Sequence, residues 1–292
     1  MYAALEYFMK KFWHDFHHPG LLSLACEAVG GKPNKGVKLG AALVLLRGAI
    51  DVHDDIIDES ITKDSIPTVY GRFGKDIALL VGDALFIKSL ILLEEAIEPL
   101  LRKQKMEILN LIKNAFFEVG YAEACEVRYR KNFDLSPEEY FEVLRLKAAA
   151  AEISARLGAI IGGGKTEQIN ALADYGRILG TLMTIRDEFV DIFEPNELKN
   201  RAAKECLPLP ILYAFKNEKI KDKILQIIQK DELKESDCFK IADLIFESDD
   251  VKKLKGNMKN LIREASAKIE FINNLEVKNV LKNLLKLSLK DL

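Results

Sequence analysis

The sequence lacks most features that mark secreted, membrane-spanning or nucleic-acid-binding proteins. Its four cysteines are scattered and form no CxxC pair, so we expect reduced thiols at Cys26, Cys125, Cys206 and Cys238. No uncharged apolar run reaches the ~18 residues of a membrane span, and the N-terminal residues do not resemble a secretion signal. The formal net charge of −2 gives no electrostatic footprint for nucleic acid. These absences predict a cytoplasmic protein without a transmembrane segment.

Strand-like alternation is also missing, and apolar residues instead recur every three or four positions. Hydrophobic residues make up 49% of the chain and charged residues 30%, which is typical of a globular protein with a real core. No internal repeat or low-complexity linker divides the sequence. We therefore predict one all-α domain over residues 1–292.

Capping and breaking residues indicate where the helices begin and end. The segment Lys75–Phe117 is expected to form two helices that separate near Glu98–Pro99. Ser136 caps a further helix, with Glu139 completing a capping box, and this helix is expected to stop at Gly162-Gly163-Gly164. Further helices are expected at about 167–193, 207–216, 219–230, 236–247 and 251–273, followed by a lysine-rich amphipathic surface helix at the C-terminus.

Four aspartates share one face of a predicted helix. Asp51, Asp54, Asp55 and Asp58 lie at i, i+3, i+4 and i+7, and the preceding turns, AALVLL, are apolar. Like charges one turn apart destabilise a helix, so we expect a further interaction that compensates for the repulsion among these carboxylates. The simplest such interaction is with a hard divalent cation held by carboxylate oxygens. A solvated acidic surface is the alternative for the whole set, and a pair with Arg47 is the alternative for Asp51.

A second acidic set lies about 130 residues later, in TLMTIRDEFVDIF. Asp187 and Asp191 share a helix face and Glu188 flanks it, again after an apolar helix with small residues. One such cluster is a weak signal, but two of them predict a site where magnesium ions surround a diphosphate. Metal ions there would neutralise the leaving group as a carbon–oxygen bond breaks.

Six segments, in the expected order, resemble the trans-isoprenyl diphosphate synthases. They are DDIID at 54–58, PTVYGRFG at 67–74, LVGDALF at 80–86, SPEEYFEVLRLKAAA at 136–150, IRDEFVD at 185–191 and KECLPLP at 204–210. The first and fifth resemble the family's two aspartate-rich regions, with Glu188 in place of an aspartate. The fourth resembles a stretch ending in Lys-Thr, with Lys147 as the lysine and Ala148 in place of the threonine. The likeness covers about residues 19–215.

The resemblance implies an antiparallel helix bundle of the isoprenoid synthase type around a central cavity, usually assembled as a homodimer. It implies a prenyltransferase that ionises an allylic diphosphate with Mg²⁺, or Mn²⁺, and condenses the allylic cation with isopentenyl diphosphate. The implied metal ligands are Asp54, Asp55, Asp58, Asp187, Glu188 and Asp191. Lys147 joins Asp54, Asp55, Asp58 and Asp187 as a catalytic residue, and the implied substrate contacts are Arg47, Lys63, Lys147, Thr184 and either Lys199 or Arg201.

Departures from the family concentrate where isopentenyl diphosphate would bind. Family positions that usually hold Lys, Arg, Arg, Arg, His and Gln hold, in that order, Asp15, His18, Lys63, Asp64, Arg47 and Thr184. No metal serves that diphosphate, so Lys63, Arg47 and a protonated His17 or His18 would have to supply its cations. Ionisation is therefore better supported than condensation.

Two further functions stay open. One is an enzyme that ionises a prenyl diphosphate and then cyclises it, as terpene synthases do, or passes it to a different acceptor. The other is a non-catalytic regulatory partner of an active synthase, which the survival of both acidic clusters disfavours. Elongation ranks first as the commonest activity of the fold. Short- to medium-chain products are expected, because Ala49 and Ile50, placed at the cavity floor by the resemblance, are not aromatic.

Overall fold

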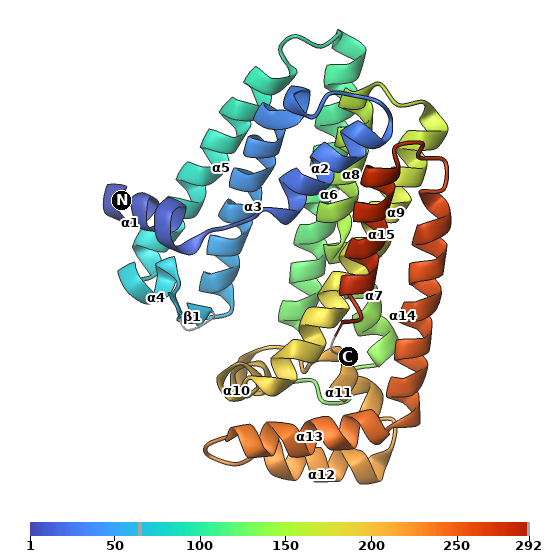
Figure 1. Cartoon of the computed structure of the whole chain (residues 1–292). Helices are drawn as coiled ribbons and strands as arrows, with labels where there is room; N and C mark the ends of the chain where they lie inside the picture. Colours follow the sequence, from blue (N-terminus) through green and yellow to red (C-terminus); the bar gives the residue numbers. More distant parts are fainter. Residues whose placement is uncertain (64–65, 291–292) are drawn as a thin grey trace. The chain divides into compact units, whose positions relative to one another are not determined.

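The computed structural model describes residues 1–63 and 66–290 and consists almost wholly of α-helices, as predicted (Figure 1). The chain separates into two compact units: residues 1–111 with 154–169, and residues 112–153 with those from 170 onward. Three helices pass from one unit into the other, namely α6 (Arg102–Tyr129), α8 (Ala149–Gly162) and α9 (Thr166–Val190). The prediction of one domain stays a prediction. The last two residues of the predicted domain, 291 and 292, lie outside the described residues, as does Asp64.

The first unit is organised around two long helices, α3 and α5, that run side by side (Figure 1). Its two-residue strands pair antiparallel, with Thr62 opposite Pro67 and Lys63 opposite Ile66, and they form a short hairpin that the sequence did not predict. The elements are α1 (Tyr2–Tyr7), a π-helical turn (Phe8–Phe12), α2 (His17–Ala28), a 3-10 turn (Pro33–Gly36), α3 (Val37–Ile57), β1 (Thr62–Lys63), β2 (Ile66–Pro67), α4 (Val69–Phe73) and α5 (Lys75–Ile97). The predicted break after Ile97 is confirmed.

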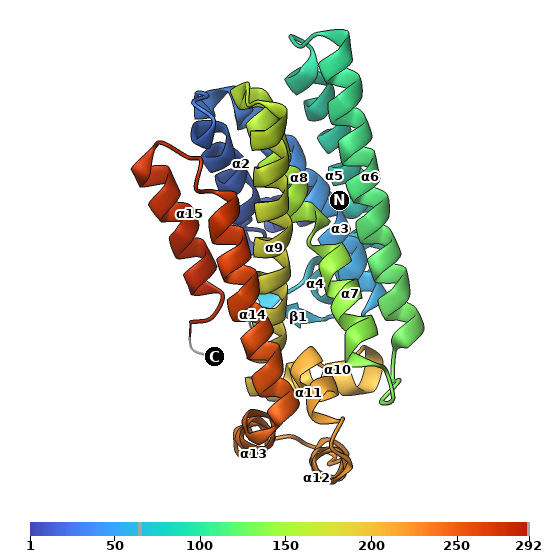
Figure 2. The same ribbon diagram turned by 90° about the vertical axis from the view of Figure 1, so that its right-hand side faces the viewer.

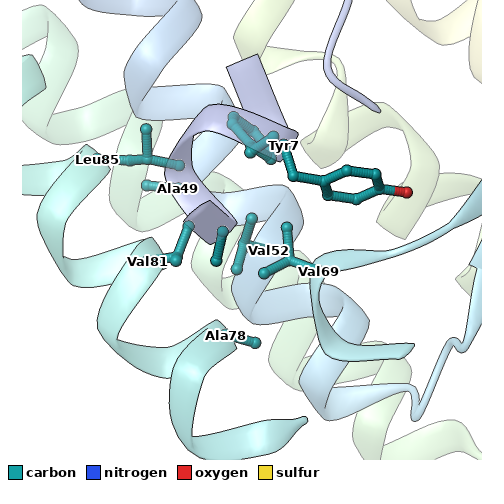
Figure 3. Close-up of a cluster of buried hydrophobic side chains, with 9 residues drawn as sticks. Tyr7, Ala49, Val52, Val69, Ala78, Val81 and Leu85 are labelled. Carbon is teal, nitrogen blue, oxygen red and sulfur yellow. The ribbon is translucent and has the colours of Figure 1, made fainter. Parts of the chain in front are cut away.

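A buried cluster joins α1, α3, α4 and α5, as Figure 3 shows. On α3, Ala49 and Val52 point into it, and Phe8 of the N-terminal segment belongs to the same cluster. Ala49 is 1% exposed among these side chains. The expectation that Ala49 lies at a cavity floor is therefore wrong, because its face of α3 packs against protein. An Ala49→Phe change would overfill this cluster.

The second unit contains the remaining helices, and α14 and α15 lie side by side in both views (Figures 1 and 2). They are α7 (Pro137–Lys147), α10 (Pro195–Lys204), α11 (Leu209–Ala214), α12 (Glu218–Ile228), α13 (Glu235–Glu247), α14 (Asp249–Lys268) and α15 (Leu275–Leu287). A 3-10 turn, Asp191–Phe193, follows α9. The amphipathic C-terminal helix is confirmed as α15, which buries Val277, Leu281 and Leu285.

Two helix predictions for this unit need correction. The helix expected from Ser136 to Gly162 is interrupted at Ala148, giving α7 and α8. Gly180 of α9 approaches this interruption so closely that an added Cβ would lie 3.0 Å from the Ala148 Cβ. Helix α10 was missed, because its segment carries one large apolar residue, Leu198, which gives a weak periodic signal. The Ser136 cap is confirmed: its Oγ accepts a hydrogen bond from the Glu139 N–H.

The four cysteines are free thiols, as expected. No helix in the described part of the chain is long and apolar enough to cross a membrane.

Close packing of α8 on α2 yields a stability prediction. A Cβ added at Gly158 would meet the Leu22 carbonyl oxygen at 2.1 Å, and backbone cannot move aside as a flexible side chain can. Gly158→Ala should therefore lower the free energy of unfolding by about 1–3 kcal/mol in urea denaturation. Gly120→Ala is the matched control, since nothing lies within 4 Å of its added Cβ. The control should be neutral or stabilising by up to about 1 kcal/mol, and equal effects would contradict the packing described.

Candidate functional site

The four aspartates of the first acidic set occupy the last turns of α3. Asp51, Asp54 and Asp55 lie within the helix and Asp58 is its C-terminal cap. Asp55 is 1% exposed, whereas the other three are half-buried. The set is therefore not an ordinary solvated surface, because a carboxylate as buried as Asp55 needs a partner.

Lys63 supplies that partner from the hairpin that follows α3. Its Nζ lies 2.9 Å from the Asp51 Oδ1 and 2.9 Å from the Asp55 Oδ1, so one ammonium bridges both carboxylates. Burial alone would lower the pKa of Lys63, but the charges of Asp51 and Asp55 outweigh burial and raise it. Lys63, predicted as a substrate contact, is thus held by the acidic set itself. Asp64, beside it, lies outside the described residues.

The segment PTVYGRFG fixes the hairpin that carries Lys63. The Thr68 N–H donates to the Ile61 carbonyl, and the Thr68 hydroxyl donates to the Ser60 carbonyl. The same hydroxyl accepts from the Gly71 N–H and caps α4. A Cβ at Gly71 would lie 2.0 Å from the Ile61 carbonyl oxygen, so glycine is required for this close approach. The family-like residues after the first aspartates therefore position the lysine.

The chemistry of the first set suits a hard cation. The Asp55 Oδ1 is paired with Lys63, whereas the buried Oδ2 atoms of Asp51 and Asp55 accept no hydrogen bond from any described residue. Burial raises the pKa of Asp55 to about 7, with Lys63 opposing the rise. Within residues 1–63 and 66–290 no three His, Cys, Asp or Glu side chains converge as a ready-made cage. Magnesium does not need one, since it often takes one or two carboxylates plus water and phosphate oxygens.

Arg47 pairs with Asp15 instead of the predicted Asp51. Its Nε lies 3.4 Å from the Asp15 Oδ2, and the His18 Nδ1 lies 3.0 Å from the same oxygen. Burial alone would raise the pKa of Asp15, but the His18 hydrogen bonds and the Arg47 charge lower it to about 2. Burial and Arg47 lower the pKa of His18, so the expectation of a protonated His18 is not supported. This cluster neutralises Arg47 with the chain's own carboxylate.

The second acidic set, on the last turns of α9, is split between solvent and core. The Asp187 side chain is 67% exposed, and the Arg186 Nη1 lies 3.8 Å from it. Glu188 is 5% exposed and uses both oxygens. Its Oε2 accepts from the Leu209 N–H at 2.7 Å, and its Oε1 accepts from Tyr140 and Arg201. Glu188 therefore does not present an open carboxylate to a metal, and its role as a ligand stays a prediction.

Arg201, expected to contact diphosphate, is the buried centre of this region. Its Nη1 donates to the Asp191 Oδ2 at 2.5 Å and its Nη2 to the Glu188 Oε1 at 2.9 Å. Burial raises the pKa of Asp191 to about 6, although Arg201 opposes the rise. The sequence held one signal for this arrangement. Arg201 follows the buried Leu198 by three residues, so both lie on the inward face of α10.

A charged network that the sequence did not reveal connects Lys147 to this arginine. Lys147 pairs with Glu126 and, at 3.2 Å, with Glu123, both on α6. The Tyr140 hydroxyl lies 3.1 Å from the Glu126 Oε1 and 3.3 Å from the Glu188 Oε1. Lys147 is 28% exposed as a side chain and remains accessible to an anion. The glutamates were missed because they belong to no acidic run and act through partners distant in sequence.

Two other predicted substrate contacts have local partners. The Thr184 hydroxyl donates to the Gly180 carbonyl one turn earlier in α9, at 3.0 Å. The Lys199 ammonium donates to the carbonyls of Ile228 and Lys230 at the C-terminal end of α12. Lysine there offsets the negative end of the α12 dipole. The contact of Thr184 and Lys199 with substrate stays a prediction.

Comparison with known proteins places the chain in a family. The model described as polyprenyl synthetase matches residues 17–245, and the chain belongs to that family. A short chain isoprenyl diphosphate synthase of Methanothermobacter thermautotrophicus is 33% identical over 180 residues, 61% of this chain and 54% of the relative. A geranylgeranyl diphosphate synthase of Sulfolobus acidocaldarius is 26% identical over 60% of this chain and 53% of the relative. These matches span about half the length of each relative.

Solved structures share the fold over nearly the whole chain. The crystal structure of a geranylgeranyl pyrophosphate synthetase from Pyrococcus horikoshii gives a TM-score of 0.87 at 26% identity, covering 99% of this chain and 89% of that one. A geranylgeranyl pyrophosphate synthetase from Geoglobus acetivorans gives a TM-score of 0.86 at 22% identity. The predicted all-α fold of the isoprenoid synthase type is confirmed.

The Lys63 bridge yields a second prediction. Lys63→Met leaves Asp51 and Asp55 without their shared cation, so the free energy of unfolding without metal should fall by about 1–3 kcal/mol. Urea denaturation in the presence of a chelator measures this. Lys38→Met is the control: Lys38 lies on α3, the helix that carries Asp51 and Asp55, and pairs at 3.8 Å with the exposed Glu95, so its loss should cost less than about 1 kcal/mol. Indistinguishable variants would show that the bridge contributes nothing to stability.

Proposed function

We propose that this chain is a prenyltransferase, a short- to medium-chain trans-isoprenyl diphosphate synthase. Its substrates would be an allylic diphosphate and isopentenyl diphosphate, and its metal Mg²⁺, with Mn²⁺ as a substitute. One observation carries the proposal: in a chain of the polyprenyl synthetase family, α3 ends in aligned aspartates, and the buried Oδ2 atoms of Asp51 and Asp55 accept no hydrogen bond from the described residues. Carboxylates in that state favour a cation, and geranylgeranyl diphosphate synthases among the relatives support the substrate class.

The proposed roles follow from exposure and charge. Asp54, Asp55 and Asp58 would hold metal on α3, and Asp187 would hold it on α9. When bound, the metal would neutralise charge on the departing diphosphate. Lys147, with its accessible ammonium held by Glu123 and Glu126, would bind diphosphate oxygens. Lys63, on the hairpin, would have its ammonium released to bind an anion once a metal takes over Asp51 or Asp55.

A different acceptor is the second candidate function, and the Asp15 cluster favours it. Asp15 and His18 stand where the family resemblance implies a lysine and an arginine, and Asp15 takes up the charge of Arg47. In this cluster one carboxylate offsets the single arginine, and burial with Arg47 lowers the pKa of the His18 imidazole, so little positive charge remains to hold a second diphosphate. An enzyme that ionises its substrate and then cyclises it, or passes it to another nucleophile, would not need that charge.

Turnover of geranyl and farnesyl diphosphates with Mg²⁺ tests these functions. Labelled isopentenyl diphosphate should enter a longer prenyl diphosphate, with diphosphate released in equal amount. Release of diphosphate without label uptake would replace elongation with the cyclase or alternative-acceptor function. No turnover in either assay would favour a regulatory partner of an active synthase.

Removing a carboxylate from each acidic set gives the third prediction. Asp54→Ala and Asp187→Ala should each lower turnover by about 10²–10³-fold or more, because each removes stabilisation of the leaving diphosphate. Circular dichroism should show intact folds. Asp83→Ala is the control, since the Asp83 side chain lies on α5, is 64% exposed and pairs with His53 at 3.5 Å. An active double variant would refute the metal-assisted mechanism.

We also propose a homodimer formed through α5. Leu80, Ile87 and Ile91 are each 45–57% exposed, and their spacing places them on one face of α5 with the exposed Leu79 and Leu90. An apolar stripe of this kind on a monomer marks an interaction surface, and a two-fold contact of α5 with its copy would cover it.

The fourth prediction tests this assembly. Ile87→Lys should convert the dimer to a monomer, because the interface would bury an unpaired charge. Light scattering coupled to size-exclusion chromatography measures the mass. Lys88→Glu, one residue away and exposed beside the stripe, should leave the dimer intact. A wild-type monomer, or a dimer that survives Ile87→Lys, would reject α5 as the interface.

A further inference from the structure

Arg201 has the bonding pattern of a permanent internal counter-ion. Its side chain is 8% exposed, and all three guanidinium nitrogens are engaged. The Nε donates to the Cys206 carbonyl at 2.8 Å, the Nη1 to Asp191, and the Nη2 to Glu188 and, at 3.0 Å, to the Tyr140 hydroxyl. A planar guanidinium that spans two carboxylates in this way combines charge with fixed geometry.

The surrounding chain keeps the arginine in place. The 3-10 turn Asp191–Phe193 leads almost directly into α10, whose buried Leu198 anchors the helix face from which Arg201 projects. The Arg201 N–H donors, together with the Leu209 N–H, leave neither Glu188 oxygen without a donor. A metal at Glu188 would have to displace these donors and leave the guanidinium buried without its partners.

We propose that Arg201 takes the place of a divalent cation at Glu188 and Asp191, so that both carboxylates stay bound to the guanidinium when metal and diphosphate are present. The second acidic set then offers Asp187, its exposed member, to metal. The inference rests on the proposed function for the metal-binding role of Asp187 and the α3 aspartates. Arg201 is thus a positioning residue and not a contact to diphosphate.

The same arginine also fixes the lysine that would meet the substrate. Tyr140 receives the Arg201 hydrogen bond and contacts Glu126, which in turn pairs with Lys147. The chain of contacts from Asp191 to Lys147 lies wholly within the second unit and runs through protein side chains. The position of Lys147 should therefore be independent of metal.

Binding of Mn²⁺ in the presence of inorganic diphosphate, followed by electron paramagnetic resonance, tests the proposal. Glu188→Gln and the double variant Glu188→Gln, Asp191→Asn should bind as many Mn²⁺ ions as the wild type, with dissociation constants within about twofold. Arg201→Met frees two carboxylates and should bind an additional Mn²⁺, or bind Mn²⁺ about tenfold more tightly. Asp237→Asn is the control: its carboxylate is equally buried, pairs with Lys230 at 2.6 Å, and should change the melting temperature without changing Mn²⁺ binding.

Loss of a Mn²⁺ ion in Glu188→Gln or in the double variant would overturn the proposal, as would unchanged Mn²⁺ binding in a folded Arg201→Met. If Arg201→Met does not fold, the double variant decides alone: unchanged stoichiometry supports the proposal and a lost ion overturns it. Failure of the proposed function gives a different result. A wild type that binds no Mn²⁺ with diphosphate would refute the metal requirement, and a gain of Mn²⁺ in Arg201→Met would still establish that the arginine occupies a cation position.

Discussion

Each buried carboxylate of the two acidic sets is held by a basic side chain of the protein itself. The Asp55 side chain is completely buried and meets Lys63 at 2.9 Å, and Glu188 meets Arg201 at the same distance. An ionised carboxylate in such surroundings without a partner would destabilise the fold by several kcal/mol, which is a large part of the total stability of a domain. The basic partner comes in each case from a short element that follows the acidic helix, the hairpin after α3 and α10 after α9. Each acidic set is therefore completed by the segment that follows its helix. That segment supplies the basic side chain that balances the buried carboxylate before any substrate binds.

Periodicity and capping residues were enough to predict the helical class, the break after Ile97 and the cap at Ser136, because these depend on neighbours within one or two turns. The aligned aspartates of α3 could be predicted for the same reason, since residues four apart in a helix share a face. The pairs Arg47–Asp15, Arg201–Glu188 and Lys147–Glu126 could not, because they join residues 13–32 positions apart through tertiary structure that local spacing does not encode. Helix α10 shows the limit most clearly. Its buried residues are one leucine and one arginine. A single apolar residue cannot show the three- to four-residue repeat from which a helix is predicted.

Ala49 shows a second limit of sequence reasoning. Helical spacing places Ala49 and Val52 on one side of α3 and the aspartates on another, but spacing does not say what each side meets. In the structure Ala49 lies in a buried cluster with residues of α1 and α5, among them Tyr7 and Val81 (Figure 3). The family resemblance therefore placed Ala49 on the correct helix but predicted the wrong neighbours for it. The surroundings of the aspartates were easier to predict. A buried carboxylate needs a cation or a hydrogen-bond donor beside it, whereas an apolar side chain can pack against any apolar surface.

Lys63 and Arg201 balance similar charges but differ in how easily they can be exchanged. The Lys63 side chain is 37% exposed, ends in a compact ammonium on a flexible stem, and lies 2.9 Å from carboxylate oxygens of Asp51 and Asp55. On the proposed function, a divalent cation arriving with diphosphate would take over those oxygens and release the ammonium. The Arg201 side chain is 8% exposed and holds four partners with a rigid fork, so its release would break several buried hydrogen bonds at once. The charge of the first set can therefore respond to metal while the charge of the second is built into the fold. On the proposed function, this asymmetry favours the α3 aspartates over Glu188 and Asp191 as the carboxylates that respond to metal.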